Sequence, residues 1–148
     1  EKGSTVREVV WGVNTKSAKD LIARELSSDR NLSEDVEGTL HTQDDSGNYI
    51  GFKLADVANA EVPKPELNFH ENVERLNERA WPEERAHPIR IGHIVYSIER
   101  EGNWQAAKFY MDRLNFRLSD RSKDGGTFLR CEGSGFHHTI FLFHLMHD

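Results

Sequence analysis

Cysteine is almost missing from this chain of 148 residues, which contains the single cysteine Cys131. One cysteine excludes a disulfide within the chain and a zinc site made of several thiolates. Proteins without disulfides are typical of reducing compartments, and the chain shows no signal peptide. We therefore expect a cytoplasmic protein.

A long apolar run and a surplus of positive charge are also lacking. No stretch approaches the roughly 18 apolar residues of a membrane-spanning helix, so no membrane partner is expected. The 19 lysine and arginine residues are outnumbered by 25 acidic residues, which leaves a net charge of -6. Without surplus cations to neutralise phosphates, a nucleic-acid partner is not expected. The 36% of hydrophobic and 30% of charged residues are ordinary for a soluble globular protein.

The first part of the chain has the pattern of a strand, a helix and further strands. Residues 6–13 are apolar and rich in β-branched side chains, which predicts a buried strand. Ser17 fits the N-cap of a helix whose apolar residues recur three and four positions apart. Two strands, 38–42 and 49–54, then flank an Asp-Asp-Ser-Gly-Asn turn.

The last part of the chain repeats this order. It predicts a strand over 89–98, a helix capped by Asn103, and strands over 116–119, 127–131 and about 137–143. The string Leu-Ser-Ser-Asp-Arg in the first part resembles Leu-Ser-Asp-Arg in the second. We therefore predict an α+β protein with two β-α-β-β-β units.

The segment between the two units, residues 58–88, is predicted to be a linker on the surface. It contains a Val-Pro-Lys-Pro string, and proline disfavours helix in the residue before it.

One histidine, His93, lies in the middle of an otherwise apolar predicted strand. Alternation places Ile91, His93 and Val95 on one face and Ile94 and Tyr96 on the other. A buried imidazole needs a partner, because an unsatisfied polar group costs roughly 1–3 kcal/mol. Taken alone, His93 is better explained as a hydrogen-bonded core residue than as a metal ligand.

The adjacent histidines His137 and His138 open the last predicted strand, after a flexible Glu-Gly-Ser-Gly string. Strict alternation places His138 with Ile140 and Leu142, and His137 with Thr139 on the opposite face. The two histidines therefore reach one cavity only if the strand is bulged.

Five short strings occur in a fixed order along the second part of the chain. They are Gly-His-Ile-Val, Phe-Tyr followed by Leu-Asn-Phe, Leu-Ser-Asp, Phe-Leu-Arg and His-His-Thr. This order resembles the start of the catalytic domain of type I extradiol dioxygenases, of the vicinal-oxygen-chelate (glyoxalase, bleomycin-resistance and dioxygenase) superfamily. The resemblance covers residues 88–143 closely and residues 6–57 more loosely.

The resemblance implies a domain organisation built from βαβββ modules of the vicinal-oxygen-chelate fold. Residues 1–57 would be the second half of an N-terminal domain and residues 58–88 the linker. Residues 89–148 would be the first half of a catalytic domain, truncated, in a protein of four modules. Exposed sheet edges favour association, so a homo-oligomer is expected.

The resemblance also implies a chemistry, the cleavage of a catechol-type ring with insertion of both atoms of dioxygen. Relatives hold Fe(II), occasionally Mn(II), through two histidines and one carboxylate. His93 matches the first histidine ligand, and His138 matches a general acid–base that does not bind the metal. His137 matches a neighbouring position on the substrate side. An imidazole suits proton exchange because its unperturbed pKa of about 6.5 lies near working pH.

The other two metal ligands of this pattern do not occur in the chain. No glutamate follows His138, and His144 and His147 come too early to match the second histidine. Three explanations stay open: an excerpt of a longer protein, a two-module protein completed by another chain, or a binding module without metal. The chain begins with Glu1 and ends at Asp148 soon after a strand-like run, which favours the excerpt.

Other functions are also open at this point. A glyoxalase-type isomerase, or a module that binds a small molecule such as an antibiotic, uses the same unit without needing the histidine pair. A plain interaction domain is the third class.

Overall fold

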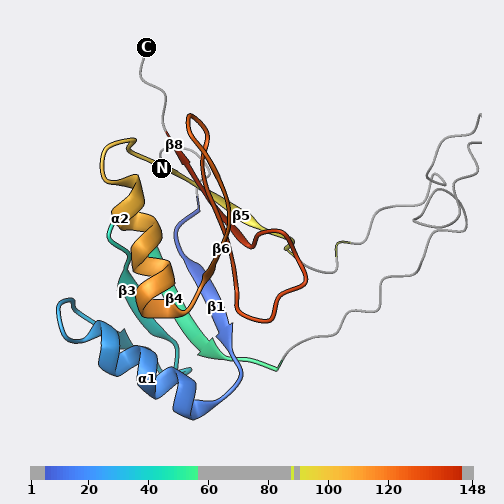
Figure 1. The fold of residues 1–148 in the computed structure, drawn as a ribbon. Helices are drawn as coiled ribbons and strands as arrows, with labels where there is room; N and C mark the ends of the chain where they lie inside the picture. Colours follow the sequence, from blue (N-terminus) through green and yellow to red (C-terminus); the bar gives the residue numbers. More distant parts are fainter. Residues whose placement is uncertain (1–5, 57–87, 89–90, 145–148) are drawn as a thin grey trace, which may run out of the picture. The chain divides into compact units, whose positions relative to one another are not determined.

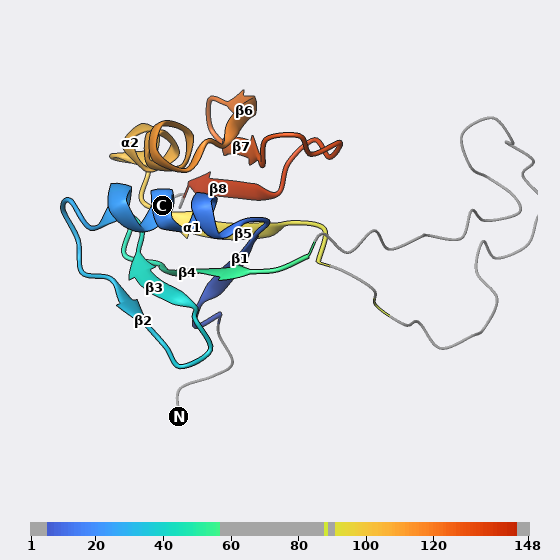
Figure 2. The ribbon, with the colours of Figure 1, turned by 90° about the horizontal axis from the view of Figure 1, so that it is seen from below.

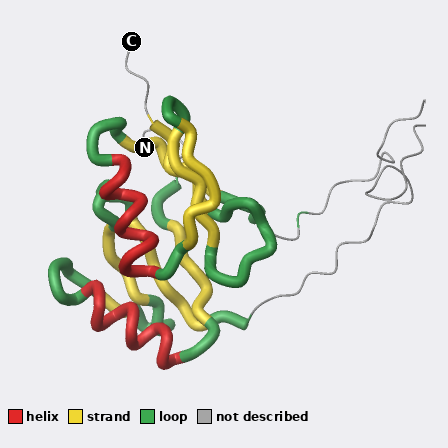
Figure 3. The backbone as a smooth tube through the Cα atoms, in the orientation of Figure 1, coloured by secondary structure: helices red, strands yellow, loops and turns green. Residues whose placement is uncertain are grey.

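The computed structural model of the chain describes residues 6–56, 88 and 91–144 (Figure 1). The predicted linker 58–88 therefore lies outside the described residues, except for Pro88. Figure 2 shows the same ribbon from below, and Figure 3 distinguishes helices from strands.

The first group of elements forms a four-stranded sheet in the order β1-β4-β3-β2, in which β1 and β4 are parallel. Its elements are β1 (Val9–Val13), α1 (Lys16–Leu26), β2 (Ser33–Glu34), β3 (Leu40–Gln43) and β4 (Tyr49–Leu54). The predicted strand over 49–54 is confirmed. The two-residue strand β2 was not predicted, because so short a strand is defined by its pairing with β3 and not by a pattern of its own.

The second group forms a sheet of the same plan, in the order β5-β8-β7-β6, with β5 and β8 parallel. Its elements are β5 (Ile94–Ile98), α2 (Asn103–Lys108), the π-helix η1 (Phe109–Arg113), β6 (Arg117–Ser122), β7 (Gly126–Arg130) and β8 (Ile140–His144). The registers agree, since Val9 pairs with Ile50 in the first sheet as Ile94 pairs with Ile140 in the second. The predicted β-α-β-β-β unit thus occurs twice.

Neither helix is capped by the predicted residue. Thr15, and not Ser17, caps α1, because the Thr15 hydroxyl accepts a hydrogen bond of 3.1 Å from the backbone N–H of Ala18. Gly102 precedes α2 with a φ of 82°, and Asn103 is the first helical residue. No helix in the described part of the chain is long and apolar enough to cross a membrane.

The strands β5 and β8 begin later than predicted, at Ile94 instead of residue 89 and at Ile140 instead of residue 137. The two strands start together because they pair in parallel, and the N–H of Ile94 donates to the carbonyl of Thr139 at 3.1 Å. His93 therefore immediately precedes its strand, and the prediction that it lies mid-strand was wrong.

Residues 6–56 and 92–144 belong to one compact unit, and side chains of η1 contact the first group of elements. The buried Tyr110 hydroxyl donates to the Asp44 carboxylate at 2.7 Å. Burial and this carboxylate raise the pKa of Tyr110. Arg113 binds the carboxylates of Glu25 and Asp29 at 2.9 and 2.8 Å. Tyr110 and Arg113 of η1 thus bind side chains of the first group of elements.

Candidate functional site

Strands β7 and β8 of the second sheet have one buried side and one half-buried aromatic side. Leu129, Ile140 and Leu142 are fully buried in the core. Phe128, Phe141 and Phe143 alternate with these residues and are half-buried, so they lie on the opposite side of the sheet. We call the side that carries these three phenylalanines the aromatic face. Phe128 and Phe141 stack on it with parallel rings whose centroids are 4.1 Å apart.

His93 and His138 meet at the end of this sheet where β5 and β8 begin. Their ring centroids are 4.6 Å apart and their planes are inclined by 44°. The His93 side chain is exposed and His138 is half-buried. The bond between Ile94 N–H and the Thr139 carbonyl holds together the residues that directly follow these two histidines.

His138 lies on the aromatic face, with its ring centroid 5.1 Å from that of Phe128. The prediction that it shares a face with Ile140 was therefore wrong. Residues 136–139 are not strand, and the alternation begins only at Ile140. Burial, and then the neighbouring His93 and His137, lower the pKa of His138.

His137 is exposed and also contacts Phe128, with ring centroids 5.6 Å apart. Its Nδ1 lies 3.0 Å from Nδ1 of His138. A hydrogen bond between these atoms requires one ring to donate and the other to accept, so at least one imidazole of the pair is neutral. Irregular backbone thus lets both adjacent histidines reach one site. We call His93, His137 and His138 the histidine cluster.

The histidine cluster does not by itself form a complete metal site. Within residues 6–56 and 91–144, no group of three or more histidine, cysteine, aspartate or glutamate side chains is placed to hold a metal ion. His144 does not join the cluster: its side chain is buried on the opposite face and 3% exposed. Burial, together with Arg100 and Arg121, lowers the pKa of His144.

Sequence reasoning missed the contribution of the aromatic face to the site. Phe141 and Phe143 are two residues apart on β8, and Phe128 pairs with Phe141 across the ladder. The recurrence of phenylalanine at every second position was the available signal. Planar apolar side chains beside the histidine cluster are suited to contact with a flat aromatic ligand.

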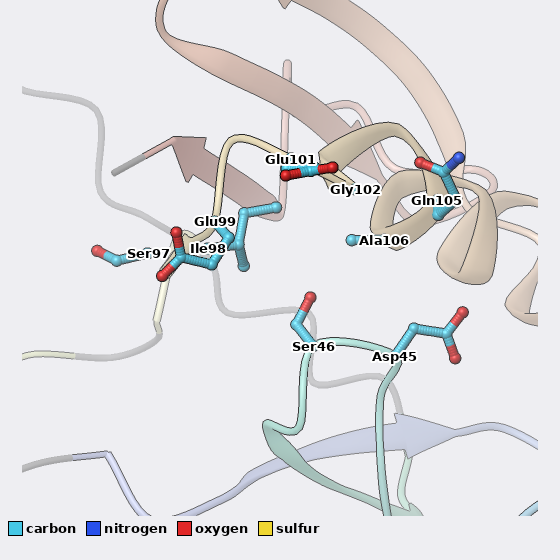
Figure 4. Close-up of a pocket in the computed structure, with 9 residues that line it drawn as sticks. All are labelled: Asp45, Ser46, Ser97, Ile98, Glu99, Glu101, Gly102, Gln105 and Ala106. Carbon is cyan, nitrogen blue, oxygen red and sulfur yellow. The ribbon is translucent and has the colours of Figure 1, made fainter. Parts of the chain in front are cut away.

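A separate hollow of about 480 Å³ lies away from the histidine cluster (Figure 4). Its lining includes Asp45 and Ser46 from the turn between β3 and β4, and Glu101 and Gln105 near α2. None of its lining residues is a histidine or belongs to the aromatic face. The hollow is thus not an extension of the candidate site.

The first sheet carries an ion-paired histidine in place of an aromatic cluster. Glu8 immediately precedes β1, as His93 immediately precedes β5. His41 occupies the position in β3 that Phe128 occupies in β7, because the strands of the two sheets pair in the same register. His41 Nδ1 lies 2.8 Å from Glu8, and its Nε2 lies 3.2 Å from Asp35. Carboxylates at both ring nitrogens favour the doubly protonated imidazolium, so these hydrogen bonds raise the pKa of His41.

This arrangement predicts a pH dependence of stability. The stabilisation by His41 should be fully present below its unfolded pKa of about 6.5 and lost as pH rises through the higher folded pKa. His41→Gln should remove this part of the decline in the free energy of unfolding between about pH 6 and pH 9, measured by urea titration. Glu8→Gln should reproduce part of the effect. If the free energy of unfolding declines with pH equally steeply in His41→Gln and in the unaltered protein, the ion-pair assignment is contradicted.

Comparison with known proteins identifies the fold. No family model matches the chain, and no curated protein matches it in sequence. Among solved structures, BphC, a halotolerant catechol dioxygenase, matches with a TM-score of 0.59 and 17% identity, over 96% of this chain and 47% of that one. The Mn(II)-bound glyoxalase from Novosphingobium aromaticivorans matches with a TM-score of 0.57 and 19% identity, over 93% and 42%.

A third match is the 2,2',3-trihydroxybiphenyl 1,2-dioxygenase from dibenzofuran-degrading Sphingomonas wittichii strain RW1. Its TM-score is 0.57 and its identity 17%, over 93% of this chain and 47% of that one. The chain thus spans less than half of each of these proteins. The likeness confirms the predicted fold, βαβββ modules of the vicinal-oxygen-chelate type, which dioxygenases and a glyoxalase share.

Proposed function

We propose that this chain belongs to an extradiol dioxygenase, which cleaves a catechol-type ring and inserts both atoms of dioxygen. The observation that supports the proposal is that the rings of His93 and His138 meet beside the aromatic face, with centroids 4.6 Å apart. These are the two positions that the resemblance in sequence assigns to metal binding and proton transfer. Segments that contribute to one site from separate strands are typical of an active site built on a rigid sheet.

In this proposal His93 is a metal ligand. Its imidazole is exposed at the start of β5, where a nitrogen is available to a metal ion. Bound Fe(II), or Mn(II), would supply the path for electrons between a catecholate and dioxygen. The second histidine and the carboxylate of the ligand set would come from a part of the whole protein outside this chain.

His138 is the proposed general acid–base. Its lowered pKa keeps the imidazole neutral near neutral pH, so that the ring can accept a proton. A catechol must lose protons to bind through both oxygens, and a neutral imidazole next to the ligand position can take one of them. The same group, once protonated, can return the proton later in the reaction.

His137 is the proposed substrate-side residue, and it also orients His138. Its Nδ1 is 3.0 Å from Nδ1 of His138, which restricts rotation of the half-buried ring. Phe128 lies against both histidines and would support the face of an aromatic substrate.

The proposal includes the organisation of the whole protein. Residues 1–57 and 89–148 would be consecutive modules from an N-terminal and a catalytic domain, joined by the linker 58–88. The whole protein would be a cytoplasmic homo-oligomer.

A second candidate is a glyoxalase-type or small-molecule-binding protein of the same fold. The comparable fit to the Mn(II)-bound glyoxalase, with a TM-score of 0.57, favours it. Such a function needs a metal or a cavity but does not need proton transfer by the histidine pair.

The variant His138→Ala in the full-length protein separates these two functions. Loss of a general acid–base should lower kcat for catechol cleavage roughly 100- to 10,000-fold, while the iron content stays unchanged. The measurement is the absorbance of the ring-opened product under air, after anaerobic loading with Fe(II). Val10→Ala is the matched control, because Val10 is 47% exposed on β1 of the first sheet, which carries no residue of the histidine cluster or of the aromatic face. Undiminished turnover of catechol in His138→Ala would contradict the dioxygenase assignment.

A further inference from the structure

Thr139 contacts three separate elements at the point where β8 is about to begin. Its backbone carbonyl accepts a hydrogen bond of 3.1 Å from Ile94 N–H of β5. Its backbone N–H donates to the Leu129 carbonyl of β7 at 2.8 Å. Its hydroxyl Oγ1 accepts from the N–H of Cys131 at 3.2 Å. One half-buried residue thus joins β5, β7 and the start of the loop after β7.

These bonds explain why His138 leaves the alternation of β8. In a regular strand the N–H and the carbonyl of one residue point to the same neighbouring strand, but the N–H of Thr139 bonds to β7 and its carbonyl to β5. On the β7 side, the N–H of Cys131 donates to the hydroxyl of Thr139 instead of to a backbone carbonyl. The chain before Thr139 therefore bends instead of continuing the ladder, and His138 is placed on the aromatic face.

The same bonds set the spacing of the two histidines. Ile94 follows His93 and Thr139 follows His138, so the bond between Ile94 and Thr139 ties together the two backbones that carry these rings. The hydroxyl bond to Cys131 prevents rotation of the bend about that tie.

We propose that Thr139 is a positioning residue, whose hydroxyl holds the bend that places the His138 ring beside His93 and the substrate. The proposal rests on the proposed dioxygenase function for its effect on turnover, but its effect on the geometry of the two rings is independent of that function.

The test replaces the hydroxyl while keeping the shape of the side chain. In full-length protein, Thr139→Val should lose the close contact between the His93 and His138 rings, seen as a nuclear Overhauser effect between their ring protons in the metal-free protein. After loading with Fe(II), kcat for catechol cleavage should fall roughly 10- to 100-fold with little change in KM, because a small misplacement of a catalytic group affects the chemical step. Thr139→Ser retains the hydroxyl and should restore both properties.

Thr127→Val is the matched control. Thr127 is fully buried on the neighbouring strand β7, and its hydroxyl has no hydrogen-bond partner among the residues that the structure describes. The same loss of a hydroxyl there should leave the ring contact and kcat unchanged.

Several outcomes would overturn the proposal. They are a preserved ring contact in Thr139→Val, an equal loss in Thr139→Ser, or an equal loss in Thr127→Val. If Thr139→Val does not fold, amide hydrogen exchange of Cys131 in the unaltered protein decides: slow exchange is expected, and the rate of a free amide overturns the proposal. If the unaltered protein cleaves no catechol but Thr139→Val still loses the ring contact, the proposed function is rejected and the positioning role of Thr139 is supported.

Discussion

Replacing His93 with alanine is expected to abolish metal binding and ring cleavage in the full-length protein, with almost no change in folding stability. The His93 side chain is exposed and its ring contacts that of His138, and it forms no ion pair or side-chain hydrogen bond with the residues that the structure describes. Surface substitutions of this kind change the free energy of unfolding by less than about 0.5 kcal/mol. Loss of bound iron without a loss of stability is the result expected for a metal ligand.

The expected size of the effect follows from the ligand count. Even partners that only orient a metal ligand are worth about 10- to 100-fold in metal affinity, so removal of a ligand should exceed that range. The measurement is iron per chain by elemental analysis after anaerobic loading and gel filtration, with turnover assayed on the same samples. His138→Ala should keep its iron, because that residue is not proposed as a ligand.

Ile91→Ala is the matched control for this experiment. Ile91 is 83% exposed and lies two residues before His93 in the same irregular segment. It should bind iron and turn over as the unaltered protein does. Stoichiometric iron in His93→Ala would show that the ligand assignment is wrong, whatever the activity of the protein.

Replacing Gly126 with alanine is expected to disrupt the second sheet. Gly126 begins β7 with a φ of 134°, a conformation that residues with a side chain rarely adopt. A Cβ atom there would lie 2.0 Å from the carbonyl oxygen of Leu142 and 2.9 Å from the Phe141 ring. Backbone strain and overpacking should together lower the free energy of unfolding on the order of 4 kcal/mol.

This loss should lower the Tm by about 10 °C or more, given roughly 2–4 °C per kcal/mol for a protein of this size. Gly47→Ala is the matched control, because Gly47 also has a positive φ, 82°, but nothing lies within 4 Å of the added Cβ. It should show the backbone strain alone, about 1–2 kcal/mol. Equal losses in the two variants would show that the close approach to β8 is not the cause.

Some elements of the fold were predictable because their signals are local. The strand Tyr49–Leu54 and the turn before it were found where predicted. The prediction that Ile140 and Leu142 share one face of their strand was also confirmed, and that face is buried. Alternating apolar side chains and turn residues carry such information within a few positions along the chain.

Other elements depend on partners distant in the sequence. The start of β5 is set by the start of β8, with which it pairs, and the two-residue strand β2 exists only through β3. The residues before β8, among them His138, are not strand, and Thr139 donates to Leu129 of β7 and accepts from Ile94 of β5. No local pattern contains such a bond, so the alternation argument failed there.

The amino-acid sequence by itself determined that the chain consists of two similar β-α-β-β-β units, since periodicity and turn residues recur in the same order. It also identified three histidines as candidates, through their place in an ordered set of strings. The tertiary structure decided that the rings of His93 and His138 meet beside the aromatic face with centroids 4.6 Å apart, and that the described residues contain no group of three side chains placed to hold a metal ion. Proximity of side chains from separate strands is set by strand pairing and backbone hydrogen bonds, which act between segments and not along them.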